Sequence, residues 1–279
     1  MSRLFRQQET RAPDTKLKHR INAGRVAVNE QRAFLRRQFG QVTSEWKADS
    51  TRVTFADFVI SENICKELRR HFPEDVYCSE EANPQDEVLS LVDTKFAWVI
   101  DPIDGTNNYA LGFPICAISL ALLREGVPIY GFVYDYGIDA LLEGGPGMNV
   151  WSNQKKLNLA SESSDVQTMF GLHFPVAVEF LEQLKPLLTR YRVRSIGSSA
   201  LNAAYVATGY LNGSVDFQCK VWDIAAACAI CAGVGVDFEF LKENPFPLES
   251  FHSQMESCAY FAARKPFYDE LKACLNMSC

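Results

Sequence analysis

The spacing of the apolar segments changes halfway along the chain, and this change limits the folds that the chain can adopt. Up to about residue 151 the apolar runs are short and come in neighbouring pairs. The pair 115–123 and 127–134 predicts an antiparallel hairpin that turns at Gly126. From residue 176 onward, expected helices alternate with expected strands. This order predicts an antiparallel-rich half, residues 1–145, and an α/β half, residues 146–279, within one compact unit.

Residue spacing also predicts the individual elements. Apolar residues recur at helical intervals in 17–39 and 54–72, so we expect an amphipathic helix in each segment. The other expected helices cover about 176–189, 199–210 and 223–233, followed by one that Pro266 opens. The other expected strands cover about 96–100, 139–143, 149–151, 191–196, 214–219, 234–240 and 258–263.

Composition narrows the class of protein. The chain is 47% apolar and 22% charged over 279 residues, which is typical of a globular protein with a sizeable core. It contains no run of 18 apolar residues and no signal-peptide pattern, so we expect a cytoplasmic protein without a membrane span. Nine cysteines are scattered through apolar segments and predict buried thiols. Cys228 and Cys231 form an isolated CxxC pair, which favours core packing over zinc or redox chemistry.

Charge is distributed unevenly along the chain. Residues 1–40 carry ten Lys or Arg and three acidic residues, about +7, although the whole chain has a net charge of −6. A solvated basic face on the first helix accounts for this charge. The alternative is a binding or regulatory protein that uses the basic helix to contact nucleic acid or an acidic partner. The segment contains no known nucleic-acid motif, so we favour the solvated face.

Two aspartates directly follow an expected buried strand. The apolar run 96–100 ends at Asp101, and Asp104 comes three residues later. Pro102 lacks a backbone donor and predicts the end of the regular strand, and the spacing lets both carboxylates turn to one side. Gly105 permits a close backbone approach to an anion. Asp, Pro and Gly also form ordinary turns. A plain turn does not need two acids at the end of an apolar strand, so a functional role is favoured.

Three further acidic residues have similar positions. Glu80 ends a short apolar run, Asp57 completes the Thr54-x-x-Asp57 spacing of a capping box, and Asp223 precedes an Ala-rich segment. Taken singly, Asp57 and Asp223 are expected to cap helices. A group of carboxylates is electrostatically costly unless cations neutralise it. Oxygen ligands without His or Cys favour Mg²⁺, Mn²⁺ or Ca²⁺ over zinc. Two such ions activate water for phosphoester hydrolysis without a protein nucleophile.

Five segments resemble the motifs of the inositol monophosphatase family, which belongs to the lithium-sensitive, magnesium-dependent sugar-phosphatase superfamily. The segment D-P-I-D-G-T-N-N-Y resembles the family's D-P-I-D-G-T-x-N-[FY] signature, and V-W-D-I-A-A resembles its second signature. The five segments occur in the family's order at 53–57, 79–81, 101–109, 194–200 and 221–226. Together they make a far more specific pattern than any one motif.

The resemblance implies both a fold and an activity. The implied fold is an α/β protein with α+β character, an α-β-α-β-α layered sandwich. The implied activity is Mg²⁺-dependent hydrolysis of inositol monophosphate or a similar polyol or sugar phosphate by a homodimer, with Li⁺ as an inhibitor. The alternatives within the superfamily are 3′-phosphoadenosine 5′-phosphate, histidinol phosphate and fructose 1,6-bisphosphate. The nucleotide and histidinol branches usually have Lys after the threonine, so Asn107 favours the inositol branch.

The resemblance also implies residue roles. Asp57 and Thr106 would orient and deprotonate the attacking water, with Glu80 completing the catalytic set. The implied ligands for two or three Mg²⁺ ions, with Mn²⁺ as a substitute, are Glu80, Asp101, the Ile103 carbonyl, Asp104 and Asp223. The implied substrate contacts are Gly105, Thr106, Gly197, Ser198, Ser199 and Asp216. For Asp216 an exposed strand position is an equal alternative.

Several segments depart from the family pattern or have no assigned role. Lys47 matches a family lysine with its spacing one residue short. The acidic segment 82–95 is unassigned and is a candidate loop beside the metal ions. The four histidines, His19, His71, His173 and His252, have no partner that the sequence identifies.

Overall fold

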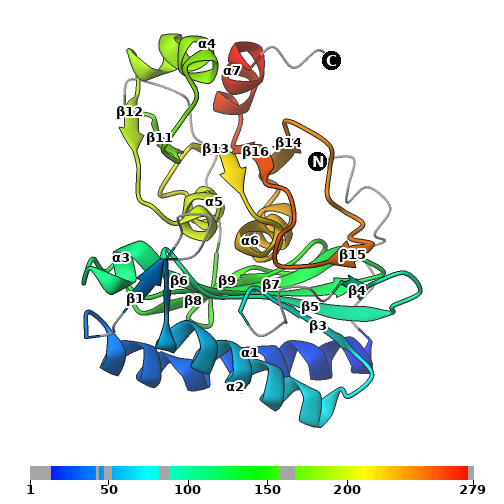
Figure 1. Ribbon diagram of the computed structural model, residues 1–279. Helices are drawn as coiled ribbons and strands as arrows, with labels where there is room; N and C mark the ends of the chain where they lie inside the picture. Colours follow the sequence, from blue (N-terminus) through cyan, green and yellow to red (C-terminus); the bar gives the residue numbers. More distant parts are fainter. Residues whose placement is uncertain (1–13, 42–43, 47–51, 82–87, 158–166, 276–279) are drawn as a thin grey trace.

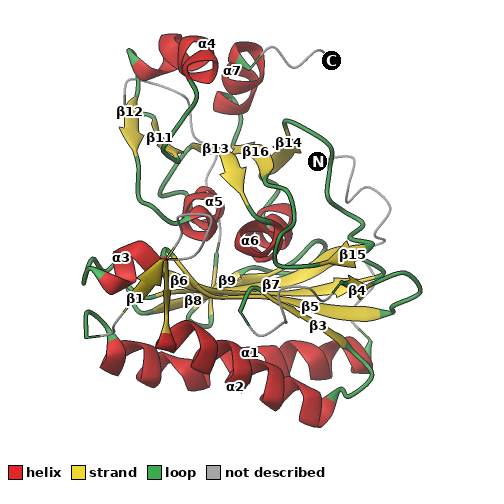
Figure 2. Cartoon of the chain, viewed as in Figure 1, coloured by secondary structure: helices red, strands yellow, loops and turns green. Residues whose placement is uncertain are grey.

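The protein forms five alternating layers of helices and sheets (Figure 1). The computed structural model describes residues 14–41, 44–46, 52–81, 88–157 and 167–275. Two helices lie beneath a seven-stranded sheet, two more separate this sheet from a five-stranded sheet, and two cover the far side of the smaller sheet. The expected α-β-α-β-α layered fold is therefore confirmed (Figure 2).

The helices occupy three layers, and a one-turn helix follows the aspartate-rich strand. The layer beneath the large sheet consists of α1 (Thr15–Gln38) and α2 (Phe55–His71), and the layer between the sheets consists of α5 (Ser199–Thr208) and α6 (Val221–Gly233). The layer on the far side of the small sheet consists of α4 (Val178–Leu188) and α7 (Phe267–Cys274). The short helix is α3 (Thr106–Ala110). All of the helices expected from the sequence are present within a few residues of their expected bounds.

The large sheet is antiparallel except at one edge, where β3 runs parallel to β5. Its strands, in spatial order, are β10 (Lys155–Lys156), β9 (Trp151–Ser152), β8 (Ala140–Gly144), β7 (Val127–Asp135), β6 (Ala117–Arg124), β5 (Phe96–Asp104) and β3 (Val76–Ser79). The hairpin expected around Gly126 is β6–β7. The apolar residues of these central strands are buried on both faces, because helices cover each side of the sheet.

The small sheet is mixed. Its spatial order is β12 (Arg192–Arg194), β11 (Met169–Leu172), β13 (Gly213–Cys219), β16 (Cys258–Ala263) and β14 (Asp237–Phe240). The first three strands are parallel, and β16 is antiparallel to both of its neighbours. Two short ladders join β1 (Ser44–Trp46) to β2 (Arg52–Thr54) and β4 (Leu89–Ser90) to β15 (Ser250–Phe251). The division into halves at residue 145 stays a prediction.

The strand that carries the two aspartates is longer than expected. β5 continues through Pro102 to Asp104, so the predicted end at Ile100 is wrong. The pairing with β6 shifts register between Asp101, which faces Ser119, and Asp104, which faces Ala117. A bulge of this kind leaves a residue without a ladder hydrogen bond, so the strand tolerates the missing N–H of Pro102.

The N-terminal helix is an integral part of the core. Leu17, Val28 and Leu35 are buried against the large sheet, as the helical spacing predicts. The predicted core positions of Cys228 and Cys231 are also confirmed, since both lie within α6 and are at most 1% exposed. Among the described residues, no helix combines the length and the hydropathy that a membrane span requires.

Candidate active site

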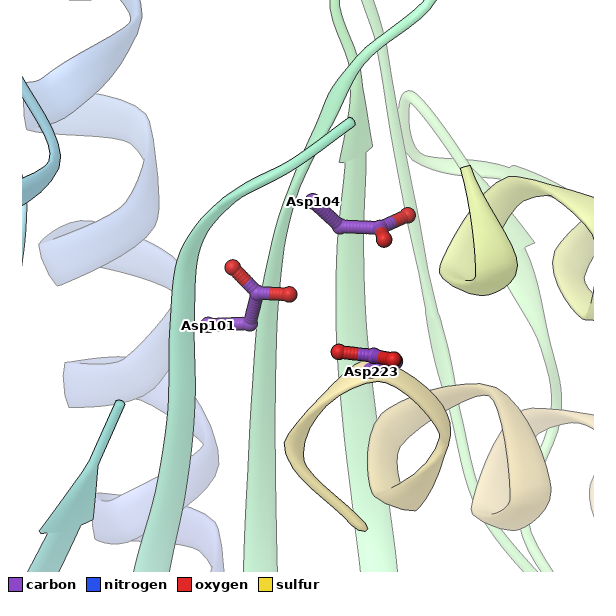
Figure 3. A group of neighbouring side chains, drawn as sticks. All are labelled: Asp101, Asp104 and Asp223. Atoms are coloured by element: carbon purple, nitrogen blue, oxygen red, sulfur yellow. The ribbon is translucent and has the colours of Figure 1, made fainter. Parts of the chain in front are cut away.

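Three aspartates from two distant parts of the chain meet between the large sheet and α6 (Figure 3). Asp101 and Asp104 lie at the end of β5, and Asp223 lies on the first turn of α6. One carboxylate oxygen from each residue lies within 4.8 Å of the other two. Asp101 and Asp104 are 2% and 8% exposed. The sequence predicted that these three side chains come together, and the geometry agrees.

Glu80 lies beside this cluster because of strand pairing. In the parallel ladder between β3 and β5, Ser79 is opposite Ile100, so the next residues, Glu80 and Asp101, emerge at the same edge. The Glu80 backbone N–H donates to the Ile100 carbonyl at 3.2 Å. The Glu80 carboxylate is close enough to raise the pKa of Asp101.

The electrostatics of the cluster are unfavourable for carboxylates alone. Burial raises the pKa of Asp101 and Asp223, and the neighbouring carboxylates raise both further. Burial also raises the pKa of Asp104 to about 6, although hydrogen bonds from Ser198 and Ala200 oppose this shift. A bound cation would offset the electrostatic cost of keeping these buried carboxylates ionised. The available donors are carboxylate and carbonyl oxygens, which suit Mg²⁺ or Mn²⁺ rather than zinc, so the residues present fit the implied metal.

The N-terminus of α5 holds Asp104 in place. The Ser198 hydroxyl donates to Asp104 Oδ2, the Ala200 N–H donates to the same oxygen at 2.9 Å, and the Ser199 N–H donates to Oδ1 at 3.2 Å. Backbone N–H groups at a helix N-terminus stabilise a negative charge. The structure thus gives Ser198 and Ser199 contacts to an aspartate of the cluster, while their contact with substrate stays a prediction.

Asp57 and Thr106 are also brought together as the sequence predicted. Asp57 Oδ2 accepts from the Thr54 N–H at 2.7 Å and from the Thr54 hydroxyl at 2.6 Å, which completes the capping box of α2. Asp57 Oδ1 lies 3.3 Å from the Thr106 hydroxyl, which also lies 2.8 Å from the Ile103 carbonyl oxygen. The carboxylate therefore has one oxygen at the helix cap and one beside the Thr106 hydroxyl.

Glycine is required where β5 turns into α3. Gly105 has φ +85°, and a Cβ atom there would lie 2.9 Å from the Ile115 carbonyl oxygen and 3.1 Å from that of Gly197. Only glycine tolerates this combination of left-handed backbone and close approach. Asn108 fixes the same junction, because its Nδ2 donates to the Ile115 and Ile196 carbonyls at 2.8 Å each. The sequence motif contained Asn108 but gave no sign of this bridging role.

Asp216 is not an exposed strand residue. It lies on β13 with none of its surface exposed, so that alternative is wrong. Asp216 Oδ2 accepts from the Ser199 hydroxyl at 2.6 Å, and Oδ1 accepts from the Gln218 N–H at 2.9 Å. His173 Nδ1 lies 3.6 Å from Oδ2. His173 was not recognisable as a site residue from the sequence, because it belongs to no motif and its partner lies on another strand.

Two sequence predictions fall outside this geometry. Lys47 and part of the acidic segment, residues 82–87, lie outside the described residues. The remainder of that segment includes β4, which pairs with β15.

Comparison with known proteins agrees with the fold. A sequence model described as the inositol monophosphatase family matches residues 12–266. The chain is 29% identical, over 82% of its length and 88% of the relative, to a protein of Aquifex aeolicus named fructose-1,6-bisphosphatase/inositol-1-monophosphatase. It is 30% identical, over 77% of its length and 78% of the relative, to Nus factor SuhB of Xylella fastidiosa.

A solved structure gives the same result. The IMPase of Thermotoga maritima superimposes with a TM-score of 0.78 and 25% identity, covering 92% of this chain and 97% of that protein. The acidic cluster, the layered fold and a family match over most of the chain all point to one conclusion. The chain belongs to the inositol monophosphatase family and is a phosphatase.

Proposed function

We propose that the protein is a Mg²⁺-dependent phosphomonoesterase that hydrolyses inositol monophosphate or a similar small polyol phosphate. The observation that carries the proposal is the convergence of Asp101, Asp104 and Asp223 within 4.8 Å. Glu80 beside Asp101 and the contact between Thr106 and Asp57 add the remaining parts expected of such a site. Retaining so many buried carboxylates is costly for a protein that does not bind cations.

The metal would be held by side chains of the cluster. Glu80, Asp101 and the Ile103 carbonyl would bind one Mg²⁺, and Asp101, Asp104 and Asp223 a second, with a weaker third site near Glu80. When bound, Mg²⁺ neutralises the carboxylates, polarises the phosphate and lowers the pKa of water. Mn²⁺ is an expected substitute and Li⁺ an expected inhibitor.

The chain itself would orient the water and accept its proton. The Thr106 hydroxyl has one hydrogen to donate, and Asp57 Oδ1 is an acceptor within 3.3 Å. The lone pairs of the hydroxyl then remain available to accept a hydrogen bond from the attacking water. Asp57 would take up the proton that the water loses as it attacks phosphorus. The Gly105 and Thr106 amides would contact the phosphate oxygens.

The substrate is expected to be a polyol phosphate, with a sugar bisphosphate as the main alternative. Asn107 after Thr106 supports the inositol branch. The Aquifex relative is named for both fructose 1,6-bisphosphatase and inositol monophosphatase activity, which supports testing both substrates. 3′-Phosphoadenosine 5′-phosphate and histidinol phosphate are the remaining alternative substrates.

A binding or regulatory role is the second candidate, because one relative is named a Nus factor. The basic side chains of α1 argue against this role for the first helix. Arg20 pairs with Asp75 at 2.6 Å, and Arg25 pairs with Glu143 at 2.7 Å. Arg32 pairs with Asp139. Much of the positive charge on α1 is thus neutralised within the molecule.

Charge reversal tests this second candidate better than deletion does. Removing residues 1–40 would take away α1, whose apolar side chains form part of the core. Lys16, Lys18 and Arg37 are exposed, so replacing them with Glu leaves the core intact. Loss of salt-sensitive RNA binding, with phosphatase activity retained, would support the binding role.

Phosphate release is the direct test of the proposed function. The purified protein is incubated with inositol 1-phosphate, fructose 1,6-bisphosphate, 3′-phosphoadenosine 5′-phosphate and histidinol phosphate, with Mg²⁺ or with EDTA. We expect Mg²⁺-dependent release that is fastest from inositol 1-phosphate. Faster release from another ester would move the substrate assignment. Equal release in EDTA would overturn the metal assignment. Light scattering of the same sample tests the expected homodimer.

A further inference from the structure

His173 joins Asp216 to the edge of the proposed active site. It directly follows β11, and its N–H donates to the Val215 carbonyl of β13 at 3.2 Å. This bond places the imidazole next to Asp216. Its Nδ1 is buried and makes no hydrogen bond within the described part of the chain, while Asp216 Oδ2 lies 3.6 Å away. A small rotation of the ring would complete a hydrogen bond between them.

The side chain of Asp216 is itself poorly placed to meet a substrate. It is 1% exposed, and its two oxygens already accept from the Ser199 hydroxyl and the Gln218 N–H. The His173 side chain is 28% exposed. Since its Nδ1 is buried, the exposed part is the rest of the ring. Of these two partners, the imidazole is the one that a substrate can reach.

The same network leads directly to the acidic cluster. Ser199 donates to Asp216 through its hydroxyl and to Asp104 through its N–H, at 2.6 and 3.2 Å. His173 is therefore linked to Asp104 of the cluster through Asp216 and Ser199, and part of its side chain remains exposed.

We propose that His173, oriented by Asp216, contacts the alcohol part of the substrate and selects esters that carry a hydroxyl group there. With Nδ1–H directed at the Asp216 carboxylate, Nε2 is the ring's hydrogen-bond acceptor. An acceptor suits a polyol, whose hydroxyl groups donate. The inference rests on the proposed phosphatase function and names His173 as a specificity residue that this function does not require for the chemical step.

Two substitutions separate substrate contact from a purely structural role. In His173→Asn, the side-chain amide can occupy the place of Nδ1 and still donate to Asp216, but nothing replaces Nε2. In His173→Gln, the longer side chain extends its amide toward the Nε2 position. His71→Asn is the matched control, because His71 is exposed on α2 and pairs with Glu67 at the surface. Kinetics are measured on inositol 1-phosphate and on 4-nitrophenyl phosphate, which has no alcohol hydroxyl.

We expect His173→Asn to raise KM for inositol 1-phosphate roughly fivefold, the value of one hydrogen bond, with kcat little changed. His173→Gln should recover part of this loss. Kinetics on 4-nitrophenyl phosphate, and those of His71→Asn on both esters, should match the unmodified protein. Wild-type kinetics for His173→Asn on both esters, or an equal loss on both, would overturn the inference. If the unmodified protein hydrolysed neither ester, the proposed function would fail and the inference with it.

Discussion

At the scale of single residues, Asp57 shows why a cap and a catalytic group are not exclusive alternatives. Its Oδ2 completes the capping box with Thr54, and its Oδ1 faces the Thr106 hydroxyl. The side chain is 2% exposed. The cap thus holds the carboxylate in one orientation, which keeps the second oxygen directed at Thr106. The capping pattern read from the sequence therefore also fixes the position of the group that we propose as the proton acceptor.

Replacing Asp57 separates the two roles. Asp57→Asn keeps an oxygen for the Thr54 contacts but loses the proton acceptor, so kcat should fall about 10²- to 10⁴-fold at nearly unchanged stability. Asp57→Ala also loses the cap and should cost about 1 kcal/mol more in unfolding free energy. Steady-state kinetics measure kcat, titration with Mg²⁺ measures the affinity for the ion, and denaturant unfolding measures the free energy of unfolding. Equal losses of Mg²⁺ affinity and kcat in Asp57→Asn would show that Asp57 is not the proton acceptor.

At the scale of elements, the position of α6 against the large sheet sets the position of Asp223. The helix packs closely because Gly131 of β7 leaves room for its backbone. A Cβ atom on Gly131 would lie 2.1 Å from the Ala226 carbonyl oxygen, which is part of α6 itself. A backbone atom cannot turn aside as a side chain can. Any side chain at position 131 must therefore move the helix or the strand.

Gly131→Ala should consequently damage both the fold and the site. We expect a loss of about 3 kcal/mol or more, the upper end for overpacking, together with weaker Mg²⁺-dependent activity, because Asp223 moves away from Asp101. Gly24→Ala is the control: its Cβ would meet the Phe132 and Trp98 rings, at 2.7 and 3.0 Å, in the core cluster beneath the large sheet and not in the one that contains α6. It should lower stability but leave kcat per folded molecule unchanged. If Gly131→Ala also left kcat unchanged, the helix position would not control the site.

The length of an element decided whether it could be predicted from the sequence. Long elements have enough residues for their apolar spacing to be recognised, so α1, α2 and the β6–β7 hairpin were predicted closely. Two-residue strands such as β4 and β10 have no periodicity to detect. The site divides in the same way. The proposed ligand residues lie in local motifs, whereas the partner of His173, Asp216, comes near it only in the folded sheet.

At the scale of the whole molecule, the distribution of charge follows the layers. Several arginines of α1 form ion pairs on the side of the large sheet that α1 covers, as between Arg20 and Asp75. On the other face of that sheet, the buried carboxylates of the cluster repel one another. Burial and this repulsion raise the pKa of Asp101 and Asp223, and burial raises that of Asp104 to about 6. Ionisation of these carboxyl groups therefore lowers the free energy of unfolding of the metal-free protein, by an amount that depends on pH.

Protonation of the buried carboxyl groups should stabilise the metal-free protein. A carboxyl group whose pKa is higher in the folded than in the unfolded protein favours the folded state when protonated. For Asp104 the pKa rises from its ordinary value of 3.8 to about 6. The metal-free protein should therefore be more stable at pH 5 than at pH 7. Asp139, whose pKa Arg32 lowers to about 2, acts in the opposite sense only below this range.

Adding Mg²⁺ should reverse the trend. The ion binds ionised carboxylates and competes with protons, so it should raise Tm more at pH 7 than at pH 5. Differential scanning calorimetry at both pH values, in EDTA and in Mg²⁺, measures both effects. Asp101→Asn is the control variant: it keeps an oxygen for the Ile103 N–H, which donates to Asp101 Oδ1 at 3.1 Å, but removes one buried charge. Its metal-free Tm at pH 7 should rise, and its response to Mg²⁺ should shrink. A metal-free Tm that instead increased from pH 5 to pH 7, unchanged by this substitution, would show that the carboxylates are not the source of the pH dependence.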